Sequence, residues 1–287
     1  MPTAEALKAA GRIGFSALTR RVRVPGMATA VERLWPALAP RCGLVDTKIG
    51  RSLHVQYDIR DEIQRHIYFG LYEPHIVSLV RAHLAGGDTF FDLGANVGYF
   101  SLLASEIVGE AGKVYAFEPV PENCRALERA IQANSLHNVV VEQAAVIGPG
   151  CATANIFVRV GAGNSGLSSI LDSRRYQTRL QQVPATTLDE YIARAGIDRV
   201  RLMKIDIEGA EPMALQGAAR LLAREDAPDV VCEVNQFLLR QRGMSGEDLA
   251  GLFSDFGYCV SGVGTHGLSS VAAVSRSEVF TVYASKR

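Results

Sequence analysis

The chain has 287 residues, of which 48% are hydrophobic and 21% charged, and its 30 basic and 30 acidic residues give a formal net charge of zero. Nucleic-acid-binding proteins usually carry a basic excess, so this balance argues against a nucleic-acid partner. No stretch reaches the roughly 18 apolar residues of a membrane-spanning helix, and the N-terminus lacks the long apolar core of a secretory leader.

The cysteines indicate the compartment. There are five, an odd number, and no two form a C-x-x-C pair. This spacing favours reduced thiols over a zinc ribbon or a disulfide framework. We therefore expect a cytoplasmic protein with one large α/β domain and an appendage.

Residues 1–70 are predicted to form an N-terminal appendage of helices and short strands. The first 40 residues are helix-prone and rich in arginine, with a break at Pro25 and Gly26. A basic amphipathic segment can lie on a membrane surface, but packing against protein is more common, so peripheral membrane contact is the less favoured alternative. Pro74 suits the first turn of a helix that begins near His75, and Glu73 then lies at its start.

Residues 71–287 are predicted to form the main domain. Apolar strands alternate with helices, and the expected core elements are strand 89–93, helix 97–108, strand 113–118, helix 122–134, strand 138–144, helix 187–195, strand 200–206, helix 211–223 and strand 230–233. Such alternation predicts an α/β fold with a doubly wound, mostly parallel, Rossmann-like sheet.

The pattern changes between residues 150 and 186, which we interpret as an inserted hairpin region. Its polar, glycine-rich centre would lie beside the pocket, where an acceptor could be recognised. Asn164 and Ser168 are the candidate substrate-binding residues, although a solvated hairpin is an equally good interpretation.

A glycine turn follows the first core strand. Asp92 lies near the end of that strand, and Gly94 and Gly98 bracket a turn before a helix, which is typical of a nucleotide-like ligand site. The dinucleotide pattern G-x-G-x-x-G is absent, and Asp92 would repel a pyrophosphate. An acid here suits a cationic amino-acid group, such as that of S-adenosylmethionine.

Acids also end the next two strands. Glu118 lies 24 positions after Gly94, where a carboxylate can grip two ribose hydroxyls, and Pro119 closes that strand. Glu142 and Gln143 end the third strand. The carboxyl ends of parallel strands meet at one edge of a sheet, so these acids should gather there.

Four motifs together resemble the FkbM-type methyltransferases, over roughly residues 70–285. They are Phe91-Asp-Leu-Gly-Ala-Asn-Val-Gly-Tyr-Phe100, Ala116-Phe-Glu-Pro119, Thr187-Leu-Asp-Glu-Tyr191 and Lys204-Ile-Asp-Ile-Glu-Gly-Ala-Glu211. The resemblance implies a methyltransferase sheet with an antiparallel last strand, S-adenosylmethionine as cofactor and methylation of a hydroxyl. It also implies that the segment around Glu73 can cover the cofactor pocket.

The predicted cofactor-binding residues lie in this segment, in the glycine turn and after the next two strands. They are Glu73, Asp92, Gly94, Ala95, Asn96, Gly98, Tyr99, Glu118, Pro119, Asn123, Glu142, Gln143 and Ala144.

The candidate catalytic residues are Asp206 and Glu208, with Glu211 as a candidate substrate-binding residue. Three acids crowded on one turn repel one another, which raises a pKa and helps a carboxylate to accept the proton of a hydroxyl. Acids at the start of a helix are also favoured for purely structural reasons. No metal is predicted, and a magnesium site of Asp206, Glu233 and Asn235 is the weaker alternative.

The sequence therefore predicts an O-methyltransferase that acts on a hydroxyl of a sugar, glycan or secondary metabolite. The alternatives are an NAD-dependent oxidoreductase on a Rossmann-like fold and a cofactor-binding scaffold without turnover. Neither the acceptor nor the oligomeric state follows from the sequence.

Overall fold

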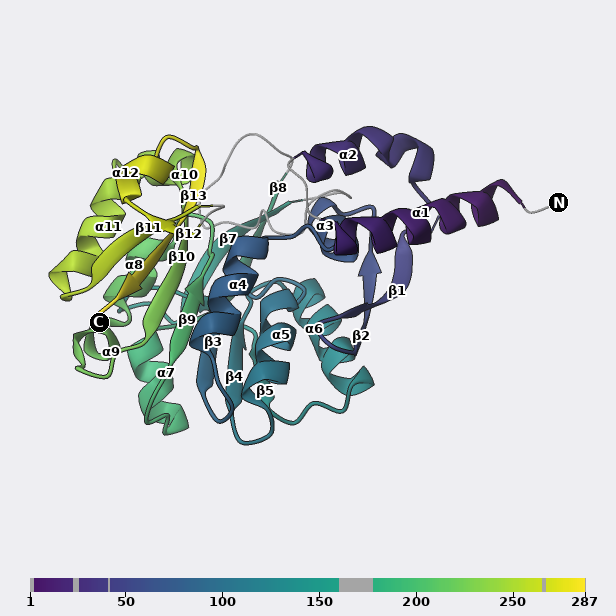
Figure 1. Ribbon diagram of the computed structural model, residues 1–287. Coiled ribbons are helices and arrows are strands. Elements are labelled where there is room, and N and C mark those ends of the chain that lie inside the picture. Colours follow the sequence, from purple (N-terminus) through teal and green to yellow (C-terminus); the bar gives the residue numbers. More distant parts are fainter. Residues whose placement is uncertain (1–2, 23–25, 41, 160–177, 265–266, 287) are drawn as a thin grey trace. The chain divides into compact units, whose positions relative to one another are not determined.

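The structure is a computed structural model that describes residues 3–22, 26–40, 42–159, 178–264 and 267–286 (Figure 1). The chain forms two compact units, which we call the first unit (residues up to Pro74) and the second unit (the described residues from His75 onward). Asn164 and Ser168 lie outside the described residues. Among the helices described, none has the length and apolar character needed to cross a bilayer.

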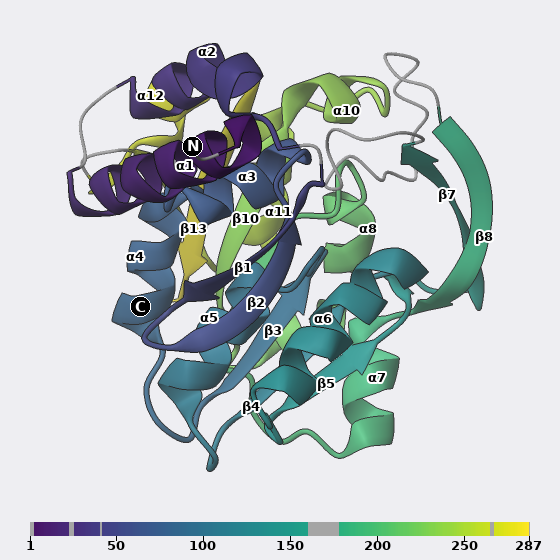
Figure 2. The ribbon, with the colours of Figure 1, turned by 90° about the vertical axis from the view of Figure 1, so that its right-hand side faces the viewer.

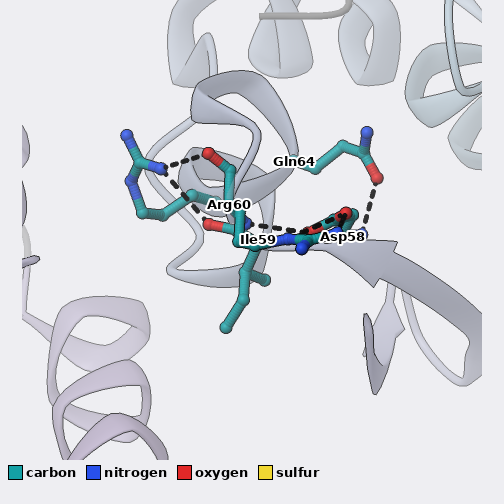
Figure 3. A network of polar contacts seen from close by, with 5 residues as sticks. Asp58, Ile59, Arg60 and Gln64 are labelled. Carbon is teal, nitrogen blue, oxygen red and sulfur yellow. Dashed lines mark hydrogen bonds and ion pairs between the residues drawn. The ribbon is translucent and has the colours of Figure 1, made fainter. Parts of the chain in front are cut away.

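The first unit contains three helices and a β-hairpin. The elements are α1 (Ala4–Arg21), α2 (Met27–Leu38), β1 (Leu44–Ile49), β2 (Leu53–Asp58) and α3 (Glu62–Tyr68). Asp61 caps α3 by accepting a hydrogen bond from the backbone N–H of Gln64 at 3.0 Å. The Gln64 side chain accepts in turn from the backbone N–H of Asp58 at 2.8 Å (Figure 3). These side chains fix the turn between β2 and α3.

The second unit is built on an eight-stranded sheet. Its strand order is β12-β11-β13-β10-β9-β3-β4-β5. The five strands from β10 to β5 run parallel, and β13, β11 and β12 are antiparallel. The predicted doubly wound, mostly parallel sheet with an antiparallel end is therefore confirmed. The strands are β3 (Thr89–Leu93), β4 (Lys113–Phe117), β5 (Val139–Glu142), β9 (Leu202–Ile205), β10 (Asp229–Asn235), β11 (Cys259–Gly264), β12 (Gly267–Ser269) and β13 (Val279–Ser285).

Helices cover both faces of this sheet (Figure 2). The largest core cluster lies under α7, α8, α9 and α11, where Phe91 and Phe117 of the sheet pack with Tyr191, Leu215 and Phe253. Helices α4, α5 and α6 lie on the other face. The helices are α4 (Pro74–His83), α5 (Tyr99–Val108), α6 (Pro121–Ala133), α7 (Leu188–Ala195), α8 (Glu211–Gln216), α9 (Ala219–Ala223), α10 (Gln236–Arg240), α11 (Gly246–Asp255) and α12 (Val271–Val274).

The inserted region contains a separate small sheet. Strand β8 (Thr178–Thr186) pairs antiparallel with β7 (Thr153–Arg159) and parallel with β6 (Ala145–Val146). Beneath it, Ile156 and Val183 pack in a second core cluster with Val120, which follows β4. The hairpin is thereby attached next to the end of a core strand.

The single helix predicted over residues 211–223 is wrong, because the structure has two helices. The first ends at Gly217, where a Cβ atom would lie 2.2 Å from the carbonyl oxygen of Ile147. The side chain of Asp189 accepts hydrogen bonds from the backbone N–H groups of Arg220 (2.8 Å) and Leu221 (2.9 Å), and so binds the start of α9. These contacts come from distant parts of the chain and outweigh the continuous helical pattern.

Helix α11 begins with a capping box. The Ser245 hydroxyl accepts from the Asp248 backbone N–H at 3.1 Å, and the Asp248 carboxylate accepts from the Ser245 backbone N–H at 2.7 Å. We expect Ser245→Ala to lower the free energy of unfolding by about 1 kcal/mol. In the control Ser254→Ala, from the same helix, the change should be within about 0.5 kcal/mol. Urea unfolding checks both, and equal values for the two variants would contradict the cap.

Candidate active site

Two glycines set the turn after β3. Gly94 has a φ of 79°, and a Cβ atom there would lie 1.8 Å from the carbonyl oxygen of Asp206. Gly98 has a φ of 85°, and its Cβ would lie 2.2 Å from a methyl carbon of Leu127 in α6. Only glycine fits either position. The turn therefore lies directly against the end of β9 on one side and against α6 on the other.

Asp92 supplies a buried acceptor beside this turn. Its side chain is 1% exposed, and its Oδ2 accepts from the Ser101 hydroxyl at 2.6 Å. Its Oδ1 is buried and accepts no hydrogen bond from any of the residues described. Burial raises the pKa of Asp92, and the nearby Lys204 ammonium opposes that rise. A buried acceptor without a donor costs free energy, which a ligand's ammonium group would recover.

Glu118 is almost completely buried. Its carboxylate is 4% exposed and accepts three protein hydrogen bonds, from the backbone N–H of Asn96 (2.8 Å), the backbone N–H of Val120 (3.0 Å) and the Asn123 side chain (3.2 Å). Burial raises its pKa to about 7, although these donors oppose the rise. A carboxylate has about four acceptor positions. About one position therefore remains, and the grip of Glu118 on the ribose hydroxyls stays a prediction.

The other predicted cofactor ligands fall into two groups. In the turn, the Ala95 backbone N–H donates to the Phe117 carbonyl oxygen at 3.0 Å, Asn96 has a left-handed φ of 51°, and Tyr99 packs edge-on against Phe100. Pro119, Glu142, Gln143 and Ala144 follow the next two strands, with Gln143 exposed and Ala144 buried.

Glu142 is placed differently from the acids of the turn. Its carboxylate lies 3.9 Å from the guanidinium of Arg194 in α7. Together with burial, it raises the pKa of Tyr191 to about 12. Glu142 therefore faces α7. Glu73 belongs to the first unit, so its role in the pocket stays a prediction.

A buried ion pair lies at the end of β9. Lys204 is 3% exposed, and its ammonium lies 2.8 Å from Asp206 Oδ2 and 5.2 Å from the centre of the Phe100 ring. Lys204 is in register with Asp92 on β3. The ammonium forms an ion pair with one oxygen of Asp206 and also opposes electrostatically the rise that burial causes in the pKa of Asp92.

Glu208 and Glu211 complete the acidic cluster. Glu208 is partly buried, has a left-handed φ of 50°, and accepts from the Asn235 side chain at 3.1 Å. Burial, and then repulsion by Asp206 and Glu211, raise its pKa to about 8. A non-glycine residue in this strained conformation is a hint of function.

Glu211 is 1% exposed and accepts from the Gly209 backbone N–H at 3.0 Å. Burial raises its pKa to about 7. Its Oε2 is buried and accepts nothing from the described residues. It is therefore a second buried carboxyl oxygen available to a ligand.

The alternative magnesium site of Asp206, Glu233 and Asn235 stays a prediction. The Lys204 ammonium already lies on Asp206. Asn235 uses its amide oxygen to cap α10, accepting from Leu238 at 3.3 Å, and its amide nitrogen to bind Glu208. Asp206 and Glu233 each offer a carboxylate oxygen, and these two atoms lie within 4.8 Å of each other, but we derive no step through a metal.

Two residues of the site were not predicted. Ser101 lies one turn into α5 and binds Asp92, and Lys204 pairs with Asp206. Lys204 opens one of the quoted motifs, whereas Ser101 lies one position beyond the end of another. A lysine two positions before an acid on a strand points to the same face. That spacing was the available signal for Lys204, whereas nothing in the sequence marked Ser101.

The known proteins that this chain resembles are methyltransferases. A family model described as the methyltransferase FkbM domain matches residues 92–260. A probable cobalt-precorrin-6B C(15)-methyltransferase (decarboxylating) from Sulfolobus acidocaldarius is 38% identical over 69 residues, which are 24% of this chain and 36% of that protein. Methyltransferase sdnD from Sordaria araneosa is 26% identical over 177 residues, covering 53% of this chain and 67% of that protein.

Among solved structures, methyltransferase FkbM from Methylobacillus flagellatus KT aligns with 80% of this chain and 56% of its own, at 15% identity and a TM-score of 0.46. Each match with these proteins spans only part of the relative's length.

The buried carboxyl group of Glu211 should make stability depend on pH. A pKa raised from 4.5 to about 7 means that the folded protein binds this proton more tightly than the unfolded chain. The resulting stability is present below about pH 4.5 and is lost as the pH rises through about 7. Glu211→Gln keeps an acceptor for Gly209 and removes the titration. We expect the variant to be more stable than the wild type at pH 8, by about 1–3 kcal/mol, and to differ less at pH 5.

Urea unfolding at the two pH values measures this difference. The exposed Glu225 provides the control, since Glu225→Gln should follow the wild-type pH dependence. If Glu211→Gln also followed the wild-type curve, the buried carboxyl group would not be the titrating group.

Proposed function

Because the chain belongs to the methyltransferase FkbM family, we propose that it transfers a methyl group from S-adenosylmethionine to a hydroxyl oxygen of a sugar, glycan or secondary metabolite. The observation that carries the proposal is the buried Oδ1 of Asp92, which accepts no hydrogen bond from any described residue and which lies beside a glycine turn. When bound, S-adenosylmethionine supplies a methyl group already activated by a positively charged sulfur.

The residues present fit this cofactor. Asp92 would take the ammonium of its amino-acid end, and the remaining acceptor position of Glu118 would take one ribose hydroxyl. The turn from Gly94 to Gly98 and the start of α5 leave backbone close to the ligand. Pro119, Glu142, Gln143 and Ala144 remain proposed ligands of the nucleoside end.

The charge of Asp92 opposes the nicotinamide alternative. Asp92 is buried beside the turn where a dinucleotide would place its pyrophosphate. A carboxyl group in that position repels phosphate, and the pattern G-x-G-x-x-G is absent. We therefore do not retain an oxidoreductase. A scaffold without turnover is separated from an enzyme by the catalytic test below.

We propose Glu208 as the acceptor of the hydroxyl proton. Its pKa of about 8 is close to the value at which a general base works best near neutral pH. Asn235 holds one of its oxygens, which fixes the orientation of the carboxylate. Asp206 remains the second catalytic candidate. Lys204 binds its Oδ2, and we propose that its Oδ1 orients the acceptor. Glu211 remains a proposed contact of the acceptor.

Cofactor binding tests the first part of the proposal. Asp92→Asn removes the charge, so it should weaken S-adenosylmethionine by about 10- to 100-fold and weaken the uncharged product S-adenosylhomocysteine less. Glu118→Ala removes a contact with ribose, which both ligands share, so it should weaken both equally. Calorimetry with both ligands and with NAD measures this, and the exposed Asp255→Asn is the control. Tight binding of NAD without binding of the methyl donor would overturn the function.

Turnover tests the role of Glu208. Glu208→Gln should lower kcat by about 100-fold or more, because the amide cannot accept the proton, while the Kd of S-adenosylmethionine stays within a few-fold. Production of S-adenosylhomocysteine with a panel of hydroxyl acceptors measures kcat. The exposed Glu110→Gln is the charge-matched control. A kcat of Glu208→Gln equal to that of the control would remove Glu208 from the mechanism.

A further inference from the structure

Helix α1 turns its polar side chains toward the first unit. Arg12, Ser16 and Thr19 are buried. Arg12 donates to the carbonyl oxygen of Leu38 at 2.8 Å, and Ser16 donates to that of Tyr68 at 2.9 Å. A surface helix of a globular protein normally has the opposite arrangement, since burial of apolar side chains drives folding. This helix is attached to its unit through these hydrogen bonds and through the edge-on contact of Phe15 with Phe69, whose ring centroids lie 5.7 Å apart.

The other side of α1 is exposed and apolar, and we call it the apolar face. It consists of Ala6, Leu7, Ala10, Ile13, Gly14, Ala17 and Leu18, all of them exposed. At about 100° per residue these positions share one arc of about 140°. The exposed fractions of the three large side chains are 60% for Leu7, 64% for Ile13 and 50% for Leu18. No described residue of the first unit covers them, so a partner of some kind is indicated.

Basic residues accompany the apolar face. The first 40 residues contain six basic and two acidic residues, although the whole chain has no net charge. Arg20 and Arg21 end α1 and are exposed. Arg20 is held there by hydrogen bonds to the carbonyl oxygens of Tyr68 and Lys48, both at 2.8 Å. A partner that matches this surface is therefore both apolar and anionic.

We propose that the apolar face of α1 binds the surface of an anionic phospholipid bilayer. At about 1.5 Å per residue, the 18-residue helix is about 27 Å long and would lie in the plane of the interface. Its three large apolar side chains enter the boundary of the acyl chains, and Arg20 and Arg21 remain at the phosphate groups. Nucleic acid is a poorer match, because it offers no apolar surface to leucine and isoleucine. This proposal stands independently of the methyl-transfer reaction.

Sedimentation of the full chain with lipid vesicles tests the proposal. We expect binding to vesicles of phosphatidylcholine with about 30% phosphatidylserine, weaker binding to phosphatidylcholine alone, and loss of binding as sodium chloride rises from about 0.1 to 0.5 M. The double variant Ile13→Gln/Leu18→Gln should reduce partitioning at least tenfold. Arg21→Gln, which leaves the apolar face intact, should reduce it about fivefold. The control is Leu268→Gln, which changes a side chain that is 51% exposed in β12 of the second unit and should bind like the wild type.

Each rival occupant of the apolar face gives its own result. Failure of the wild type to bind phosphatidylserine vesicles, or equal binding by the double variant and Leu268→Gln, would overturn the proposal. A concentration-dependent dimer that the double variant abolishes would assign the face to a second copy of the chain. A lower free energy of unfolding in the double variant than in Leu268→Gln would assign it to the protein's own second unit. Either assignment would also overturn membrane binding.

Discussion

The backbone of Gly94 lies against the carbonyl oxygen of Asp206, and the arrangement of the site depends on this contact. The space between them admits no Cβ atom, so any side chain at position 94 would force the turn after β3 away from the end of β9. The contact brings Asp92, from the strand before the turn, close to Lys204 and Asp206 on the neighbouring strand. The proposed site for the cofactor's ammonium and the acidic cluster thereby share one edge of the sheet.

The buried carboxyl groups at this edge of the sheet lower the free energy of unfolding. Glu118, Glu208 and Glu211 all have pKa values raised by burial, so their charged forms are disfavoured in the folded protein. Lys204 offsets part of that cost, since it is a buried cation among several acids. Groups placed in this way contribute little to folding and much to binding a cationic ligand or accepting a proton, which is characteristic of active sites.

The two units place polar and apolar side chains in opposite ways. In the second unit the core is conventional, with Phe91, Phe117 and Tyr191 packed between the sheet and α7. In the first unit α1 buries Arg12 and Ser16 through hydrogen bonds to carbonyl oxygens and leaves Ile13 in solvent. Hydrogen bonds can hold a helix in place, but they do not remove its apolar side chains from water. The apolar face of α1 is therefore the feature of this unit that a binding partner would explain.

Much of the fold followed from the sequence because its signals are local. Apolar strands alternating with helices predicted the doubly wound sheet, and Gly94 and Gly98 marked the turn of the proposed site. Each of these signals lies within a few residues, where chain geometry and hydrogen bonding act directly. The acids at the strand ends could be predicted for the same reason.

The tertiary structure decided how far each side chain is buried and what it contacts. The three donors to Glu118, the pairing of Glu142 with Arg194 and the break at Gly217 could not be read from the pattern. They depend on contacts between parts of the chain that are well separated in sequence, as when Ile147 meets Gly217. The sequence by itself therefore determined the elements, the turn and the kinds of residue at the edge of the sheet. Only folding determined which carboxyl groups keep an oxygen available for a ligand, because packing and desolvation act across the whole unit.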